Sequence, residues 1–538
     1  MITAKQRYDK LQGDRAAFLQ MARVASDLTL PYLIRDDINF TKYKETTVTP
    51  WQSVGAKGVV TLAAKLMLAL LPPQTSFFKL QVDESEISKI GNLDPRIKSE
   101  LDLSFAKVER TIMENIAASS DRVVIHQALK HLVVSGNALI YMDKDNLKMY
   151  PLNRYAVDRD GNGNVIEIVT RERINKEVVA DVLPKEVLEE ERPNRVMADG
   201  EDPLNDEVDV YTHVRRDNNR YVWYQEVNGV KIPKSFGKSP VKTNPWIVLR
   251  FNTVDGEVYG RGRVEEFLGD LRSLEGLSKA LVEGSAAAAK VVFTVSPSAT
   301  TKPQTLAQAG NGAIIQGRPE DIGVVQVGKT ADFRTAYEMA MGLEKRLADA
   351  FLILQVRNSE RTTAEEVRMS QMELDQQLGG IYSLLTTEFL VPYLNRKLDV
   401  AQKLGIIPKI PDGIVKPTIV AGINALGRGQ DREALVTFIT TISQTMGPEA
   451  ALKYINPEEY VKRLAASQGI DVLNLVKGLQ EVQAQDQQMM QQAQQMEMTK
   501  QAGSFAATEQ KAIKDNDDTA IREQEIAAQA AAPTGQAG

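Results

Sequence analysis

One stretch of the chain has the residue types and spacing of a phosphate-binding loop. Residues 323–330 read Gly-Val-Val-Gln-Val-Gly-Lys-Thr and match the pattern GxxxxGK[ST], in which backbone N–H groups cradle nucleotide phosphates. In that chemistry Lys329 would contact the phosphates and Thr330 would bind Mg²⁺. However, the valines between the two glycines are typical of a strand, and Arg-Pro-Glu-Asp at 318–321 stands where an apolar strand should end. A nucleotide-dependent motor is therefore an alternative and not the first prediction.

Histidine and cysteine chemistry has little support in the sequence. The chain has no cysteine, which excludes disulfides and thiolate metal sites and fits assembly in a reducing compartment. Its three histidines are His126, His131 and His213, and the spacing of the first two does not place both on one face of a helix. We therefore expect no metal site and no cofactor. No enzymatic activity is expected either, because Gly260-Arg261-Gly262 lacks a third glycine and no G-x-S-x-G elbow precedes a helix with a plausible histidine partner.

A polar loop is the second stretch that could do chemistry. It spans residues 355–362 and carries these charged and polar side chains: Arg357, Asn358, Ser359, Glu360 and Arg361. A hydrophobic core does not explain the two arginines, which could contact phosphates while the glutamate offsets part of their charge. In the alternative interpretation, both arginines form ion pairs with neighbouring subunits.

A long helix is predicted to support this loop, from Thr363 to about Lys403. Thr363 and Glu366 form a capping box at its start. Apolar residues then recur at helical spacing: Val367, Leu374, Leu378, Ile381, Leu385 and Phe389.

Two features interrupt the long helix. Gly379 and Gly380 lower helix stability by about 1 kcal/mol each relative to alanine, and Pro392 lacks a backbone N–H. We expect a kink near one or both, and we interpret the glycine pair as a hinge. The alternative is an ordinary core helix that tolerates the pair.

Composition limits the classes of function. The 538 residues predict two to four domains, and 43% hydrophobic with 25% charged residues is typical of globular proteins. The net charge of −6 argues against a protein that grips nucleic acid through a strongly basic face, but it permits one that lets nucleic acid slide past. The N-terminus has no signal-peptide pattern, and the apolar run 58–73 carries Lys65, so no membrane segment is expected.

Periodicity predicts an α+β protein that is mainly helical. The N-terminal helices are expected at 15–33, 53–71, 95–118 and 121–134. A β-rich part should follow, with strands at 138–141, 147–150, 155–160, 165–169, 208–214, 221–227, 230–236 and 247–251. Asn228-Gly229 should form a tight hairpin turn, and the acidic stretch 184–207 should be a solvated insertion.

The helical period returns in the second half. We expect a helix from about 264 to 290, a small β element at 291–327, and a helix at 331–354. Beyond the long helix, a proline-containing linker at 406–416 should lead to a second helical set from about 419 to 479. The Gln, Met and Ala-rich tail from 483 onward is predicted to start helical and become disordered.

The order of these parts resembles the portal proteins, or head-to-tail connectors, of short-tailed double-stranded DNA phages of the autographivirus type. The resemblance rests on five stretches in the family's order: Thr-Pro-Trp-Gln-Ser-Val-Gly-Ala at 49–56 with Lys-Leu-Met-Leu-Ala-Leu at 65–70, Tyr-Gly-Arg at 259–261 with Leu-Gly-Asp-Leu-Arg-Ser-Leu-Glu at 268–275, Gly-Arg-Pro-Glu-Asp-Ile at 317–322, Leu-Gly-Gly-Ile-Tyr-Ser at 378–383, and Gly-Arg-Gly-Gln-Asp at 427–431. These stretches run from residue 49 to 431, and the total length also fits the family.

The resemblance implies a role for each segment of the chain. In order along the chain, the segments would be a wing (1–257), a first stem helix (258–290), a clip (291–327), a second stem helix (328–354), a channel loop (355–362), a long kinked helix (363–405), a helical crown (406–482) and a tail (483–538). Family members vary in the channel loop, so the role of individual residues there is the weakest inference from the resemblance. The phosphate-loop match falls where the family has no nucleotide site.

The resemblance also implies an assembly and its partners. Copies of the chain, usually twelve, would form a ring at one capsid vertex, around a channel that contacts double-stranded DNA without sequence readout. Expected partners are major capsid and scaffolding proteins, the terminase, and tail adaptor and internal core proteins. The protein would reside in the virion and, during assembly, in the host cytoplasm. A channel-less tail or scaffold protein is the remaining alternative.

Overall fold

The structure is a computed structural model that divides into two compact units, Met1–Leu426 and Gly427–Gly538. It describes residues 2–35, 49–73, 76–82, 95–144, 146–180, 183, 187, 207–288, 292–300, 302–310, 313–325, 330–353, 378–409, 415–420 and 436–447, with single residues 460, 492, 511, 514, 519, 521 and 522.

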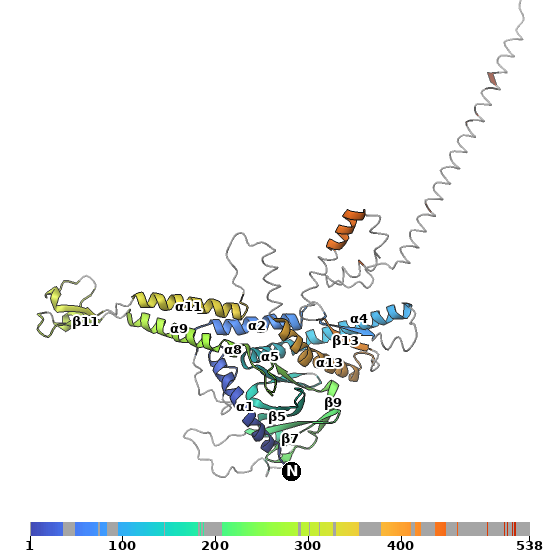
Figure 1. Cartoon of the computed structure of the whole chain (residues 1–538), viewed down its shortest axis with the longest axis horizontal. Coiled ribbons are helices and arrows are strands. Elements are labelled where there is room, and N and C mark those ends of the chain that lie inside the picture. Colours follow the sequence, from blue (N-terminus) through green and yellow to red (C-terminus); the bar gives the residue numbers. More distant parts are fainter. Residues whose placement is uncertain are drawn as a thin grey trace, which may run out of the picture. The chain divides into compact units, whose positions relative to one another are not determined.

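The first unit combines helices with antiparallel sheets (Figure 1). Its longer helices are α1 (Ala4–Asp27), α2 (Val54–Leu70), α4 (Pro95–Ala118), α5 (Asp121–Ser135), α9 (Leu268–Ala288), α11 (Thr330–Ala350) and α13 (Val391–Lys403). Shorter helices are α6 (Lys176–Ala180), α8 (Arg263–Glu266) and α10 (Pro303–Gln308). The α4 bounds agree with the sequence prediction, whereas α1 begins eleven residues before the predicted position, because Thr3 and Gln6 form a capping box there.

Helix α5 lies at the centre of the core, and the whole of its last turn is buried. Ile125, Leu129, Leu132 and Val133 are at most 2% exposed, and the helix packs against α1, α2 and the strands that follow it. It ends at Gly136, which has a φ of 73°. A Cβ on Gly136 would lie 2.6 Å from the Gly260 oxygen, so this close approach requires glycine.

Two antiparallel sheets follow α5. The three-stranded sheet has the order β10 (Trp246–Arg250), β2 (Asn137–Met142), β3 (Leu147–Tyr150). The six-stranded sheet contains β4 (Tyr155–Arg159), β5 (Val165–Asn175), β6 (Glu207–Asp217), β7 (Arg220–Val227) and β8 (Val230–Lys231) in that order, with β9 (Gly237–Pro240) also paired to β7.

The predicted hairpin at Asn228-Gly229 is confirmed. Val227 pairs with Val230, and the two turn residues have φ values of 46° and 81°. Both values are positive, as the tightest hairpin turn requires, and Asn and Gly tolerate this region best.

A two-helix arm leaves the core after residue 262. The predicted single helix is interrupted at Phe267, between α8 and α9. Helices α9 and α11 then run antiparallel, joined by a hairpin of β11 (Val292–Val295) and β12 (Ile322–Val325). The small β element predicted between two helices is therefore present (Figure 1).

The sequence interpretation was wrong about residues 415–419. Part of the predicted linker is strand β13 (Val415–Ile419), which pairs with β1 (Phe78–Val82) in register Phe78–Ile419. Pro417 lies in this strand, which sits in a two-stranded sheet where a missing N–H is tolerated. In the second unit, residues 436–446 are helical. Most of the acidic insertion, of the second helical set and of the tail lies outside the described residues.

Candidate functional site: the two ends of segment 354–377

The predicted loop residues Arg357, Asn358, Ser359, Glu360 and Arg361 lie outside the described part of the chain, whereas Gly379 and Gly380 lie within it. The structure therefore defines the site by its two ends. One end is the C-terminus of α11, and the other is the helix that begins the next described stretch at residue 378.

Helix α11 ends in a fixed turn. The Leu352 N–H donates to the Asp349 carbonyl at 3.0 Å and the Ile353 N–H to the Ala348 carbonyl at 2.8 Å. This is the hydrogen-bond pattern of a Schellman cap, which favours glycine in the left-handed position. Here that position is Leu352, with a φ of 57°, so surrounding contacts must hold it.

Two contacts from α2 hold this turn. Phe351 is 0% exposed, and a Cβ on Gly58 would lie only 2.5 Å from the Phe351 Cγ, so the ring packs directly on the backbone of α2. Two helical turns after Gly58 in α2, the Lys65 ammonium donates a hydrogen bond to the Leu352 carbonyl at 2.6 Å. Burial lowers the pKa of Lys65. The chain thus leaves the arm from a point that α2 fixes.

The other end of the segment is also buried. Residues 378–385 are helical, and Leu378, Tyr382 and Leu385 are at most 5% exposed within the main core. Gly379 and Gly380 lie in this helical stretch. Their role as a hinge stays a prediction.

The irregularity in this helix lies after the glycine pair. Residues Thr386–Leu390 form a π-helical turn immediately before α13, whose second residue is Pro392. Proline has no N–H to donate to the carbonyl four residues earlier, that of Glu388, and a wider turn is one way to accommodate this.

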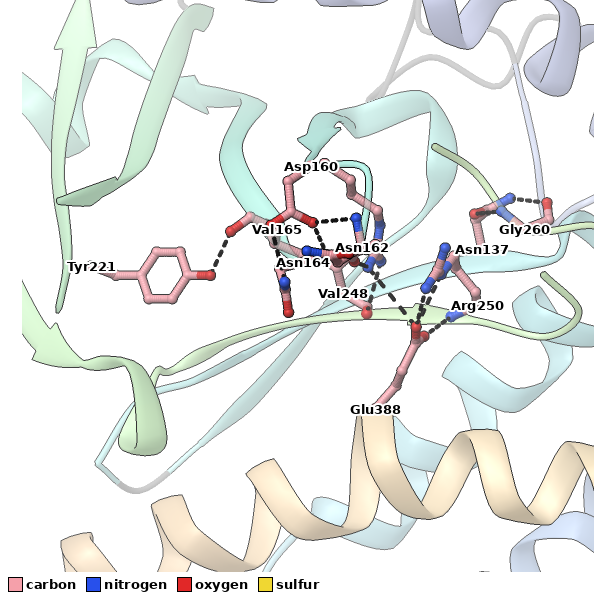
Figure 2. A network of polar contacts seen from close by, with 12 residues as sticks. Asn137, Asp160, Asn162, Asn164, Val165, Tyr221, Val248, Arg250, Gly260 and Glu388 are labelled. Carbon is pink, nitrogen blue, oxygen red and sulfur yellow. Dashed lines mark hydrogen bonds and ion pairs between the residues drawn. The ribbon is translucent and has the colours of Figure 1, made fainter. Parts of the chain in front are cut away.

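The π-helical turn presents Glu388 to the three-stranded sheet (Figure 2). Its carboxylate accepts hydrogen bonds from the Arg250 side chain, at 3.0 and 2.5 Å, and from the Arg250 backbone N–H at 3.0 Å. Arg159 lies 3.9 Å away and also donates to the carbonyls of Gly163 and Val248. Burial lowers the pKa of Arg159, and Glu388 opposes that shift. Two buried cations thus share one carboxylate.

A second buried contact anchors α13. The Tyr393 hydroxyl and the Lys397 ammonium both bind one oxygen of Asp121, each at 2.6 Å, and Asp121 is fully buried at the start of α5. Burial and the neighbouring Asp121 carboxylate raise the pKa of Tyr393 well above its usual value. The end of segment 354–377 is therefore joined to the central helix.

The phosphate-loop match does not have the geometry of a nucleotide site in its described half. Gly323 lies inside strand β12 and pairs with Thr294 of β11, where a phosphate loop would begin its turn. Its Lys329 lies outside the described residues.

The histidines have separate surroundings. Burial lowers the pKa of His131 to about 4, and His213 binds Glu167 in the six-stranded sheet. Within the described residues, no three potential metal ligands cluster together and no helix has the length and hydropathy for a membrane span.

Sequence reasoning missed the Glu388 network. One signal was available: Glu388 lies three residues after Leu385 and seven after Ile381, so a charge falls on the apolar side of the predicted helix. Its partners could not be identified, because Arg250 and Arg159 lie more than a hundred residues earlier in two different strands.

The family model for bacteriophage head to tail connecting protein matches residues 2–475. This chain belongs to that family. Its relatives include portal proteins of Escherichia phage T7 (38% identical, 94% of each chain), Enterobacteria phage T3 (39%, 89% of each) and Enterobacteria phage SP6 (31%, 90% of this chain and 92% of the relative).

These relatives confirm the resemblance to portal proteins inferred from the sequence, and the function of the chain is that of a portal or connector in the virion, at the junction of head and tail. Among solved structures, the neck of an empty gene transfer agent particle matches with a TM-score of 0.37 and 13% identity, over 78% of this chain and 90% of the other. A TM-score of this size is too low to establish a shared fold.

Proposed function

We propose that copies of this chain form a closed ring around a channel for double-stranded DNA, and that segment 355–362 of each copy points into the channel. The observation that carries the proposal is that the described residues on both sides of segment 354–377, which contains 355–362, are fixed: α2 holds Phe351, and Leu378 is buried in the core. A loop with two rigid ends can place the same charges at the same height in every subunit of a ring.

The arm supplies a surface for ring contacts. Val282 on α9 and Tyr337, Met339 and Met341 on α11 are 49–58% exposed, and a groove of about 710 Å³ runs between the two helices. Exposed apolar side chains in such numbers mark an interaction surface. A ring requires a heterologous interface, in which one face of the arm meets a different face of the next copy.

The segment roles follow from this proposal. Residues 1–257 would form the wing, 258–290 and 328–354 the stem, 291–327 the clip, 363–405 the kinked helix and 406–482 the crown. The strand pairing of β13 with β1 joins the first part of that crown to the wing. The ring would nucleate head assembly and dock capsid, scaffolding, core and tail adaptor proteins. It would be non-enzymatic and need no cofactor, because a separate terminase would supply the packaging energy.

Electron cryomicroscopy of the purified protein tests the ring. Top views with an open axial hole would support the proposal and give the subunit number. Monodisperse particles without a hole would contradict it and favour a channel-less structural protein. Saturable ATP binding that is lost on Lys329→Ala would instead favour a motor.

Packaging assays test the loop. Arg357→Ala with Arg361→Ala should leave rings intact and reduce the yield of packaged genomes, because two cations per subunit no longer face the DNA. The matched control, Lys107→Ala with Arg110→Ala, removes the same charge from the exposed side of α4. Equal yields for both double variants would contradict the role of the loop.

A further inference from the structure

One face of the six-stranded sheet carries a group of exposed cations that the portal function does not explain. In the antiparallel register, Arg215 of β6 lies opposite Val222 of β7, which lies opposite Lys238 of β9. Directly opposed residues share a face, and so do residues two apart along a strand. By this rule one face holds the four cations that we name the basic strip: Arg215, Arg220, Lys231 and Lys238.

The strip has a local excess of positive charge. Residues 215–242 contain seven Lys or Arg and two Asp or Glu, a formal charge of +5 in a chain of −6. Four of the seven cations lie on the face of the strip, where Asp217 lies opposite Arg220 and Glu226 lies opposite Lys231. All four strip residues are exposed, and within the described part of the chain none of them forms an ion pair with a carboxylate. Of the two acidic residues, Glu226 is buried and accepts the Ala4 N–H at 2.9 Å.

Helix α1 covers the neighbouring part of the same face and leaves the strip open. Its first turns pack Ala4, Tyr8 and Leu11 against strands β4, β5 and β6. At the edge of this contact the Lys231 ammonium sits 4.2 Å from the centre of the Tyr224 ring. The strip therefore continues from the edge of α1 toward Arg220 and Lys238, along strands β7 and β9 (Figure 1).

We propose that the basic strip binds the phosphate backbone of duplex DNA outside the channel. Neighbouring strands are about 5 Å apart and successive residues on one face about 7 Å apart, so the cations form a flat array that can contact several phosphates. Phosphate contacts carry no sequence information, which suits DNA of any sequence. This site goes beyond the proposed channel because it needs neither a ring nor segment 355–362.

An acidic protein partner fits the strip less well. Protein interfaces have an apolar, charge-depleted centre with a polar rim. Here Arg215 and Lys238, which flank Val222 in the register, are exposed, whereas Val222 itself is half-buried, so the exposed surface of the patch is charged rather than charge-depleted. The arrangement favours a polyanion.

Binding of covalently closed circular duplex DNA tests the proposal, because a closed circle has no end to enter a ring. Arg215→Ala, Arg220→Ala and Lys238→Ala are combined in one variant. Its matched control combines Lys10→Ala, Lys107→Ala and Lys144→Ala, three exposed cations elsewhere in the first unit. Both should keep the unfolding temperature and assembly state of the unaltered protein.

The expected result is a flatter salt dependence for the strip variant alone. Each phosphate contact contributes about 0.9 to the slope of log K against log salt, so the slope should fall by about 2–3, and affinity at low salt at least about tenfold. Equal slopes for the two variants would overturn the proposal. The proposal would also be overturned if the unaltered protein did not bind circular DNA but bound polyglutamate through the strip. That result would indicate an acidic protein as the partner of this surface. If the protein bound circular DNA but formed no rings, the channel proposal would be contradicted, whereas the proposed DNA binding by the strip would be supported.

Discussion

The six-stranded sheet pairs its buried carboxylates within the chain, whereas the outer part of the α9–α11 arm leaves apolar side chains exposed. In the sheet, Glu167 is only 5% exposed and binds both Arg7 and His213. In the arm, Tyr337 and Met339 are each 58% exposed. The contrast teaches that the buried side of the sheet is complete in a single chain, while the arm has an apolar surface that neighbouring copies can complete. Four predictions test this comparison, and each concerns the free energy of unfolding of the unassembled subunit.

The largest expected effect is at Glu388. Glu388→Gln removes the carboxylate charge shared by the buried side chains of Arg250 and Arg159, and breaking such a pair costs about 3–5 kcal/mol in the free energy of unfolding. Unfolding by denaturant measures this loss of free energy. The control is Glu114→Gln, whose exposed pair with Arg110 should contribute at most about 0.5 kcal/mol. A loss below about 1 kcal/mol at Glu388 would show that the network does not stabilise the subunit.

A smaller, pH-dependent effect is expected at Glu167. Burial raises its pKa, but hydrogen bonds from His213 and Arg7 outweigh burial and lower the pKa to about 2. Because the folded pKa is depressed, this contribution is present above the unfolded pKa of about 4.3 and is lost as pH falls toward 2.

Glu167→Gln should therefore cost about 1–3 kcal/mol at pH 7, by leaving buried donors without an ionised partner, and should flatten the loss of stability between about pH 4.3 and 2. Unfolding measured across that window checks both points. An unchanged pH profile would mean that Glu167 ionises alike in the folded and unfolded chain.

A still smaller effect, of opposite sign, is expected at Gly380. A Cβ there would meet nothing within 4 Å, so Gly380→Ala should stabilise the helix by about 0.5–1 kcal/mol. Gly13→Ala in α1 is the control, with equal space. If the glycine pair is a hinge, Gly380→Ala also lowers packaged-genome yield and Gly13→Ala does not. Equal packaged-genome yields for the two variants would contradict the interpretation of the glycine pair as a hinge.

The smallest effect on unfolding is expected in the arm. Tyr337→Ser with Met339→Ser should change the free energy of unfolding by under about 0.5 kcal/mol, because both side chains are exposed in the single subunit. Assembly should instead need at least about tenfold more protein, as measured by light scattering. The control, Val123→Ser with Val178→Ser, alters residues that are 73% and 67% exposed outside the arm. Equal assembly of the two variants would contradict the comparison.

The candidate site was predictable only in part. The apolar spacing of Leu378 and Leu385 identified a buried helix, and Pro392 correctly indicated an irregularity nearby. The helix break at Phe267 and the left-handed Leu352 had no such signal. Leu352 in particular occupies a position that favours glycine, and it does so because α2 supplies Lys65 and a close packing surface for Phe351.

The sequence by itself determined the local features of this protein. Helix α4 and the Asn228-Gly229 turn depend on spacing and backbone preference within a few residues, so they could be read directly. Tertiary structure decided which distant segments meet. Strand β13 pairs with β1 across more than three hundred residues, and Glu388 meets Arg250 across 138. Burial of these partners supplies the free energy for such contacts, and burial is a property of the folded chain rather than of any short stretch of it.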